Sequence, residues 1–178
     1  MRKDFIFAGS GGQGIISLAI LLANAYGIFE NYEVAQTQSY GAAARGGASQ
    51  ASLVVSDRPI AHIDVDAADV FVAFNEPGFK KYYPKAKKDA IVFVDTTLID
   101  EACYNDISNK VYALDATNIA EHQFKPFMAN VVMMGYMAAI LGDISLDSLK
   151  KVIAAQLPAK AYDENVAALE AGYSRGVK

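Results

Sequence analysis

The chain lacks several features by which catalytic and metal-binding proteins are often recognised. It has no tryptophan, two histidines and a single cysteine in 178 residues. One thiol cannot form an internal disulfide, and it cannot by itself hold an iron–sulfur cluster or a cysteine-rich zinc ion. The longest apolar helical pattern, near residues 127–141, is too short to cross a bilayer, and no signal-peptide core follows Met1. We therefore expect a cytoplasmic protein that binds neither a metal ion nor a membrane.

The charge balance narrows the choice of partners further. The net charge is -4 and no basic stripe is visible, which argues against nucleic acid as a partner. Hydrophobic residues make up 53% of the chain and charged residues 20%, a composition typical of a globular protein. The length suits one domain with a sizeable core, and we expect that domain to span residues 1–178.

Familiar catalytic patterns are missing as well. His62 and His122 lie far apart in the sequence, and neither belongs to an H-E-x-x-H pattern; no G-x-S-x-G pattern occurs. Asp64, Asp66 and Asp69 are close together, but no glycine-shaped calcium loop surrounds them, so we interpret them as a solvated edge. We predict no catalytic residue in this chain, which indicates a subunit whose chemistry lies elsewhere.

The N-terminal part is organised around a glycine-rich turn, Gly-Ser-Gly-Gly-Gln-Gly at residues 9–14. An apolar run precedes it and a helical pattern at 15–26 follows, which predicts a Rossmann-like strand, glycine turn and helix. The G-x-G-x-x-G spacing predicts a sharp turn at Gly9, room for a close backbone approach at Gly11, and tight packing at Gly14. Free N–H groups at the helix start would attract an anion or a polar backbone group.

The glycine turn alone does not identify a nucleotide site. A dinucleotide site of the NAD type also needs an acidic residue at the end of the second strand, about 20 residues further on. The second strand, predicted at 32–37, has Glu33 near its start and polar, uncharged residues at its end. No lysine follows Gly14, so the P-loop pattern is absent too. A structural turn, or a turn that lets another polypeptide approach, is favoured over a free-standing nucleotide-binding protein that uses Gly9–Gly14.

The pattern of apolar residues predicts an α/β protein. Strands are expected at 3–8, 32–37, 51–55, 60–65, 70–74, 90–95 and 111–114. Helices are expected at 15–26 with Gly27 as its stop, from Asn75, from Asp115 or Thr117 as cap, at 126–141, from Ser145 to Pro158, and at 162–173. This alternation indicates a single three-layer domain with a mostly parallel, mixed sheet, in which 51–55 and 60–65 form a hairpin.

Two further places carry polar or glycine residues that need an explanation. Asn130 lies on a crowded apolar helix and must find a partner, either as a buried tie to a neighbouring loop or, less favoured, as a ligand contact. The segment 38–49 is rich in small residues, with Tyr40 as its only large apolar side chain. It is either an ordinary surface turn or a binding loop in which Arg45 meets a carboxylate, phosphate or carbonyl of a partner.

These segments together carry a family resemblance. The motifs are Gly9-x-Gly11-Gly12-Gln13-Gly14-Ile15, Ser39-Tyr40-Gly41-x-x-x-Arg45-Gly46-Gly47-x-Ser49, Ser56-Asp57-x-Pro59-Ile60, Ala68-Asp69-Val70 and Asn130-Val131-Val132-Met133-Met134-Gly135. In order and spacing they resemble the gamma subunit of 2-oxoacid:ferredoxin (acceptor) oxidoreductases, over nearly the whole chain. One departure is that the family often has Pro-Glu after Tyr-Gly, where this chain has Ala42-Ala43.

The resemblance implies an enzyme that decarboxylates a 2-oxoacid on thiamine diphosphate. It implies that electrons pass through iron–sulfur clusters to ferredoxin and that the acyl group passes to coenzyme A. The thiamine and cluster sites would lie largely on alpha, beta and, where one is present, ferredoxin-like delta subunits, and whether coenzyme A contacts this chain is left open. This chain would bind none of them alone, would be inactive alone, and could pair with itself when isolated. The 2-oxoglutarate type is favoured, with pyruvate and ketoisovalerate types left open.

The same resemblance suggests where the chain meets its partners. We expect the glycine loops to lie where the backbones of two chains come together around the active centre. The residues assigned to this interface or active-centre loop are Gly9, Gly11, Gly12, Gln13, Gly14, Tyr40, Gly41, Arg45, Gly46, Gly47 and Asn130.

Overall fold

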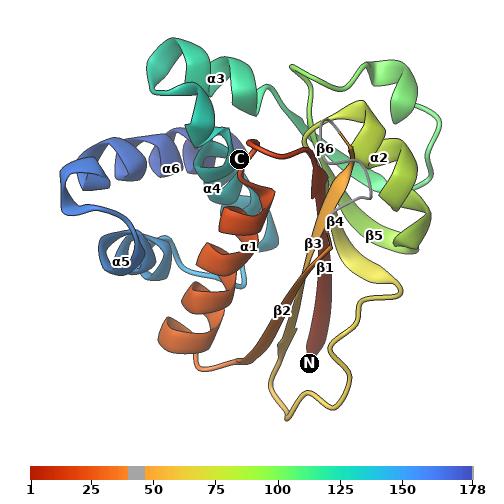
Figure 1. Ribbon diagram of the computed structural model, residues 1–178, viewed down its shortest axis with the longest axis horizontal. Helices are drawn as coiled ribbons and strands as arrows, with labels where there is room; N and C mark the ends of the chain where they lie inside the picture. Colours follow the sequence, from red (N-terminus) through yellow and green to blue (C-terminus); the bar gives the residue numbers. More distant parts are fainter. Residues whose placement is uncertain (40–46, 178) are drawn as a thin grey trace.

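Strand β1 (Arg2–Gly9) lies inside a six-stranded sheet with the strand order β2-β3-β1-β4-β5-β6. This sheet is seen in a computed structural model that describes residues 1–39 and 47–177 (Figure 1). The predicted loop residues Tyr40, Gly41, Arg45 and Gly46 lie outside the described residues. The apolar run of β1 is fully buried from Phe5 onward, which fits a strand covered on both faces.

The sheet is mixed and mostly parallel, as predicted. On one side of β1, strands β4 (Ala68–Ala73), β5 (Ala86–Asp95) and β6 (Lys110–Leu114) follow in parallel. On its other side β3 (Ser49–Ser56) runs antiparallel, and β2 (Glu33–Ser39) pairs antiparallel with β3.

The predicted hairpin between 51–55 and 60–65 is wrong. Residues 60–65 form no strand, and the antiparallel partners of β3 are β1 and β2. Because these two strands occupy both edges of β3, no free edge remains with which 60–65 could form a hairpin. Residues 57–67 instead run as an irregular segment over the surface.

Helices cover both faces of the sheet and give three layers (Figure 1). Helix α2 (Glu76–Tyr82) covers one face. The other face carries α1 (Ile15–Asn24), α3 (Ala116–Gln123), α4 (Ala129–Leu141), α5 (Leu146–Gln156) and α6 (Tyr162–Gly176). Short helical turns are η1 (Ala25–Phe29), η2 (Tyr83–Lys85), η3 (Glu101–Cys103), η4 (Pro126–Met128) and η5 (Ala159–Ala161). Within the described ranges no helix combines the length and the apolar character needed to cross a bilayer.

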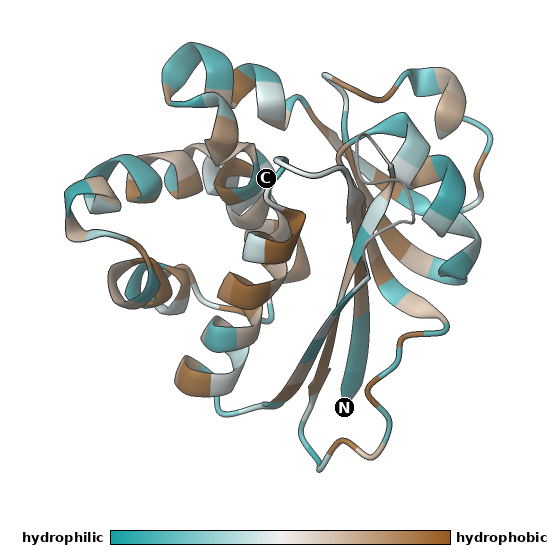
Figure 2. Cartoon of the chain, viewed as in Figure 1, coloured by the Kyte–Doolittle hydropathy of each residue, from teal (hydrophilic) through white to brown (hydrophobic). Residues whose placement is uncertain are grey.

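Alternate residues of β1 divide the core into two hydrophobic clusters. Phe5 and Phe7 face the larger cluster under α1 and α4, whereas Ile6 and Ala8 face the smaller cluster under α2. Most of α1 is apolar in Figure 2, because this helix is packed between the sheet and neighbouring helices. The strict alternation follows from the two-residue period of a strand.

Several helix ends are explained by single residues. Gly142 ends α4 with φ +67°, as predicted, and the Ser145 hydroxyl accepts a hydrogen bond from Ser148 N at the start of α5. The prediction that Gly27 ends the first helix is wrong, because the chain continues through it as the π-helical turn η1. The group that caps the start of α3 was not predicted from the sequence. It is the buried Asp95 carboxylate, which accepts hydrogen bonds from Thr117.

Helices α4 and α6 cross at two glycines. A Cβ atom added to Gly172 would overlap Val132 O, and one added to Gly135 would overlap Leu169 O. The two backbones therefore touch directly, with no room for even a methyl group between them. This close crossing fixes the position of the N-terminal end of α6, which forms one wall of the candidate site.

Candidate functional site

The glycine turn is held in shape by the side chain of Gln13. Gln13 Oε1 accepts hydrogen bonds from Ser10 N (2.8 Å) and from Asn75 Nδ2 (3.1 Å), and Gln13 Nε2 donates to Phe74 O (3.0 Å). The amide therefore joins the end of β1 to the segment that follows β4. Its oxygen and one of its two N–H groups are thus hydrogen-bonded within the chain, which indicates a positioning residue.

Two of the predicted glycines are needed because neighbouring atoms leave no room. A Cβ on Gly9 would lie 2.8 Å from Gln13 Oε1. Gly14 has φ +72°, and a Cβ there would lie 2.5 Å from Asn130 Nδ2. The close contact at Gly14 is therefore with helix α4, where the sequence had indicated packing of α1 against a strand.

The other two glycines of the turn face open space. Gly11 and Gly12 are exposed, and a Cβ added to either has no atom of the described chain within 4 Å. Gly12 has φ +91°, a backbone conformation that favours glycine. Gly11 has no such requirement, so the close approach predicted at Gly11 is not made by the described part of this chain. The space above the turn is available to a ligand or a partner.

Asn130 is the buried tie to a neighbouring loop that the sequence favours. Its side chain is 6% exposed, Nδ2 donates to Gly14 O (3.2 Å), and Oδ1 accepts from Val131 N (2.9 Å). The amide thus links the start of α4 to the start of α1. It also forms part of the wall of a pocket.

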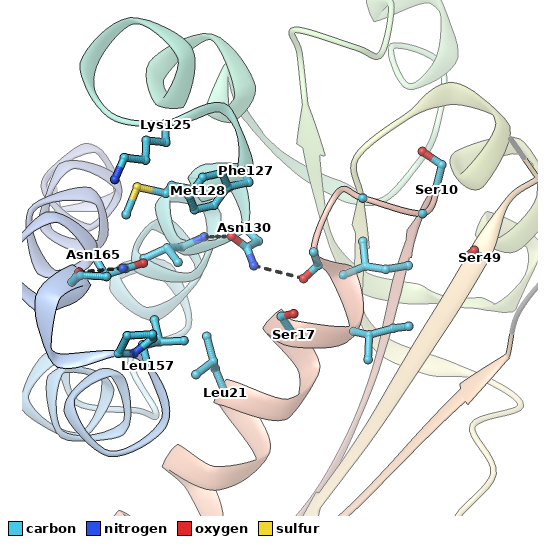
Figure 3. A pocket seen from close by; sticks show the side chains of 18 of the residues that line it. Ser10, Ser17, Leu21, Ser49, Lys125, Phe127, Met128, Asn130, Leu157 and Asn165 are labelled. Atoms are coloured by element: carbon cyan, nitrogen blue, oxygen red, sulfur yellow. Dashed lines mark hydrogen bonds between the residues drawn. The ribbon is translucent and has the colours of Figure 1, made fainter. Parts of the chain in front are cut away.

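This pocket, of about 720 Å³, lies between the glycine turn, the start of α4 and the chain that joins α5 to α6 (Figure 3). It brings together four predicted residues, Gly11, Gly12, Gly14 and Asn130. Gly9 and Gln13 stand behind it. Gly47 precedes β3 and is not part of the wall, although Ser49, two residues later, lines the pocket and pairs with Gly9.

The pocket has apolar walls and a positive rim. Leu21, Val131 and Leu157 line it, and Phe127, which is 65% exposed, stands beside them. Lys125 and Lys160 are exposed lining residues, and Lys125 is paired with Glu164 at 2.6 Å. Helix α1 begins here with no side-chain cap and no acidic residue in its first turn. The first N–H groups of α1 therefore contribute positive potential to the pocket, in addition to that of the lysines.

Asn165 supplies a buried polar group that points into this pocket. It is 6% exposed, and its Nδ2 donates to Ala161 O at 2.8 Å. Asn165 lies in the wall of the pocket (Figure 3), and among the described residues its oxygen accepts no hydrogen bond. No described side-chain N or O atom is both buried and without a hydrogen-bond partner, so this oxygen is accessible and can accept a hydrogen bond from a ligand N–H or O–H group.

Asn165, Lys125 and Lys160 are not among the site residues that the sequence predicted. A signal for Asn165 existed, because it lies four positions before the buried Leu169 and so on the inward face of α6. No comparable signal marks the two lysines, which come to the pocket from separate turns. Among residues 1–39 and 47–177, no group of three or more His, Cys, Asp or Glu side chains could hold a metal ion.

Comparison with known proteins gives a consistent picture. Residues 4–175 match the family model for pyruvate ferredoxin/flavodoxin oxidoreductase. The 2-oxoglutarate synthase subunit KorC of Methanocaldococcus jannaschii is 35% identical over 97% of this chain and 93% of its own length.

Two solved structures share the fold. The gamma subunit of a keto/oxoacid ferredoxin oxidoreductase from Geobacter sulfurreducens superposes with a TM-score of 0.88 at 27% identity, over 99% of this chain and 97% of that chain. A 2-oxoglutarate:ferredoxin oxidoreductase from Magnetococcus marinus, solved with 2-oxoglutarate, coenzyme A and succinyl-CoA bound, gives 0.87 at 23% identity. That match covers 98% of this chain and 31% of the longer chain.

Proposed function

We propose that this chain, which belongs to the pyruvate ferredoxin/flavodoxin oxidoreductase family as a gamma subunit of a 2-oxoacid:ferredoxin oxidoreductase, serves an enzyme that acts on 2-oxoglutarate. The reaction would convert 2-oxoglutarate and coenzyme A into succinyl-CoA and carbon dioxide, with two electrons passed to ferredoxin. The identity to a 2-oxoglutarate synthase subunit over nearly the full length of both chains supports this substrate.

The division of labour within the complex follows from what this chain contains. It has one cysteine and no pair of residues suited to act as nucleophile and base. We therefore assign thiamine diphosphate and the iron–sulfur clusters to alpha, beta and ferredoxin-like delta subunits, and expect no turnover from this chain alone. The Magnetococcus chain, of which this chain covers 31%, supports close contact between such a domain and a larger polypeptide.

Within that complex we assign coenzyme A to the pocket beside the glycine turn. Coenzyme A combines phosphates, amide groups and an apolar linker, and its thiol receives the acyl group. The start of α1 and Lys160 would attract the phosphates, while Leu21, Val131 and Leu157 would pack against the linker. The oxygen of Asn165 carries this assignment, because it lines the pocket and can accept a hydrogen bond from a donor such as an amide N–H.

Partner subunits would complete the site around the exposed glycines. Gly11 and Gly12 leave room for a second backbone. Beside Gly9, β2 ends and β3 begins, through the pairs Ser39–Gln50 and Ser49–Gly9. The segment 40–46 joins these two strands in sequence. Its proposed role, in which Arg45 meets a polar group of a partner, rests on the sequence.

The assignment of coenzyme A is tested in the co-expressed complex. Asn165→Leu keeps the branching of the side chain, although leucine is larger, and removes the acceptor, and Lys160→Met removes one charge. Each is expected to raise the KM for coenzyme A by about tenfold, the effect of one lost hydrogen bond or charge contact of 1–2 kcal/mol. The KM for 2-oxoglutarate should stay unchanged. The control is Lys151→Met on the exposed side of α5, and unchanged KM values in all three variants would reject the assignment.

A free-standing nucleotide-binding protein is the second candidate. The uncapped start of α1 beside the glycine turn favours it, whereas the lack of an acidic residue at the end of β2 speaks against it. Thermal melting of the full-length chain with NAD, FAD or ATP separates the two. A specific nucleotide at about 100 times its dissociation constant adds about 2.7 kcal/mol to stability, and the absence of any shift would remove this candidate.

A further inference from the structure

A second pocket, of about 550 Å³, lies on the α2 face of the sheet, opposite the face that carries α1. Its floor is the end of the β2–β3 pair, where Thr37 lies opposite Ser52 and Ser39 lies opposite Gln50. One wall is the end of α2 with η2, and the other is the irregular segment 57–67. The volume falls within the usual range of small-molecule sites, about 300–1,000 Å³.

The floor is polar where the rest of this sheet face is apolar. Ser52 is 3% exposed and Gln50 is 8% exposed, while Val54, the next inward residue of β3, belongs to the hydrophobic cluster. Gln50 Nε2 donates to Ser52 Oγ (2.8 Å), and Lys85 Nζ approaches Gln50 Oε1 at 3.4 Å. These hydrogen bonds satisfy the buried polar groups of the floor, and the polar atoms that line the pocket suit a polar ligand better than an apolar one.

One wall is positively charged. Lys81 and Lys85 are exposed, lie one helical turn apart and line the pocket. Among the described residues neither forms an ion pair, although Lys80 beside them is paired with Glu76 at 2.9 Å. No described carboxylate neutralises either lysine of the pocket, so both can hold a carboxylate or another anion.

The opposite wall is acidic. Asp64 and Asp66 line it together with His62, whose Nε2 lies 3.5 Å from Asp66 Oδ2. No described lysine lies within 4 Å of either carboxylate. The pocket is therefore lined by positive and negative side chains that form no ion pair with each other. A simple anion would be repelled by the aspartates, and a simple cation would be repelled by the lysines.

We propose that this pocket binds a small zwitterion of the free amino-acid class. The carboxylate of the ligand lies against Lys81 and Lys85, its ammonium group lies against Asp64 and Asp66, and its remaining polar atoms meet the floor at Gln50. Such a ligand satisfies both walls at once, which neither a carboxylic acid nor an amine alone can do. This site is separate from the proposed coenzyme A pocket and does not depend on that assignment.

Calorimetric titration of the full-length chain tests the proposal with three probes. L-glutamine carries both charges, glutarate has carboxylates without an ammonium group, and butylamine has an ammonium group without a carboxylate. Only L-glutamine is expected to bind. Equal or tighter binding of glutarate would reveal an anion site and overturn the proposal, as would the absence of binding by L-glutamine.

Paired variants locate the site. Lys81→Met with Lys85→Met, and separately Asp64→Asn with Asp66→Asn, should each weaken L-glutamine binding by about tenfold or more. The matched control combines Lys88→Met with Asp106→Asn, exposed residues outside the pocket, and should leave binding unchanged. Unchanged affinity in both pocket variants would overturn the proposal. All these side chains are exposed, and the probe comparison on the unmodified chain decides the question even where a variant fails to fold.

Discussion

Replacing Gly14 with alanine tests how the turn is joined to the rest of the domain. The backbone at Gly14 has φ +72°, which costs an alanine about 1–2 kcal/mol. The new Cβ would also lie 2.5 Å from Asn130 Nδ2, so the amide must move away and lose its hydrogen bond to Gly14 O. Overpacking of this kind costs about 1–3 kcal/mol. We expect Gly14→Ala to reduce the free energy of unfolding by about 2–5 kcal/mol in total.

Gly142→Ala is the matched control for the backbone cost. Gly142 has φ +67°, nearly the same conformation, but an added Cβ there has no atom of the described residues within 4 Å. It should cost only the backbone component of about 1–2 kcal/mol. Urea unfolding of the full-length chain, followed by circular dichroism, measures both variants. Equal losses from Gly14→Ala and Gly142→Ala would refute the reasoning that Asn130 crowds the turn.

A double-mutant cycle gives the same contact a second measurement. Asn130→Ala removes the amide that the new methyl group would strike, so Gly14→Ala should cost less in that background. The coupling energy between the two changes should exceed about 1 kcal/mol, as for residues in direct contact. Additive effects would show that the turn and helix α4 are energetically independent.

Three further predictions address other parts of the domain. Gly172→Ala, whose methyl group would overlap Val132 O at the α4–α6 crossing, should cost about 3 kcal/mol or more in urea unfolding, whereas Gly11→Ala, which has free space, should be nearly neutral. A hydrogen bond from the backbone amide at the start of α5 lowers the pKa of Glu30. Its stabilising effect is therefore present above the ordinary value of 4.5 and is lost as pH falls through the folded-state pKa. The stability difference between wild type and Glu30→Gln should shrink between pH 6 and pH 3, and a constant difference would contradict this. Burial raises the pKa of the Cys103 thiol, so iodoacetamide should modify it more slowly at pH 8 than it modifies free cysteine, and an equal or faster rate would contradict this.

The elements that the sequence predicted well depend on local signals. The glycine spacing between β1 and α1, Gly142 after α4 and Ser145 before α5 all act within a few residues of themselves. The prediction of a strand at 60–65 was wrong because strand pairing depends on distant segments and not on local signals. A period of two indicates that a segment can be a strand, but pairing depends on a free sheet edge, and β2 occupies the edge that this segment needed.

The candidate site was predicted in part for similar reasons. Asn130 was found because a polar residue within an apolar helix is a local contradiction. Asn165 lies on the amphipathic helix α6, where a polar residue is ordinary, so the sequence offers a weaker signal there. The cap of α3 by Asp95 and the arrival of Lys125 and Lys160 at the pocket depend on contacts between distant segments, which neither composition nor spacing reveals.

Anaerobic purification of the tagged chain from its source organism tests the central claim most directly. The preparation is assayed for partner subunits, thiamine diphosphate, iron–sulfur absorbance and coenzyme A-dependent ferredoxin reduction with 2-oxoglutarate, pyruvate and 2-oxoisovalerate. The account predicts a coloured, multi-subunit preparation that contains thiamine diphosphate and turns over 2-oxoglutarate fastest. A colourless single chain without partners or activity would contradict it.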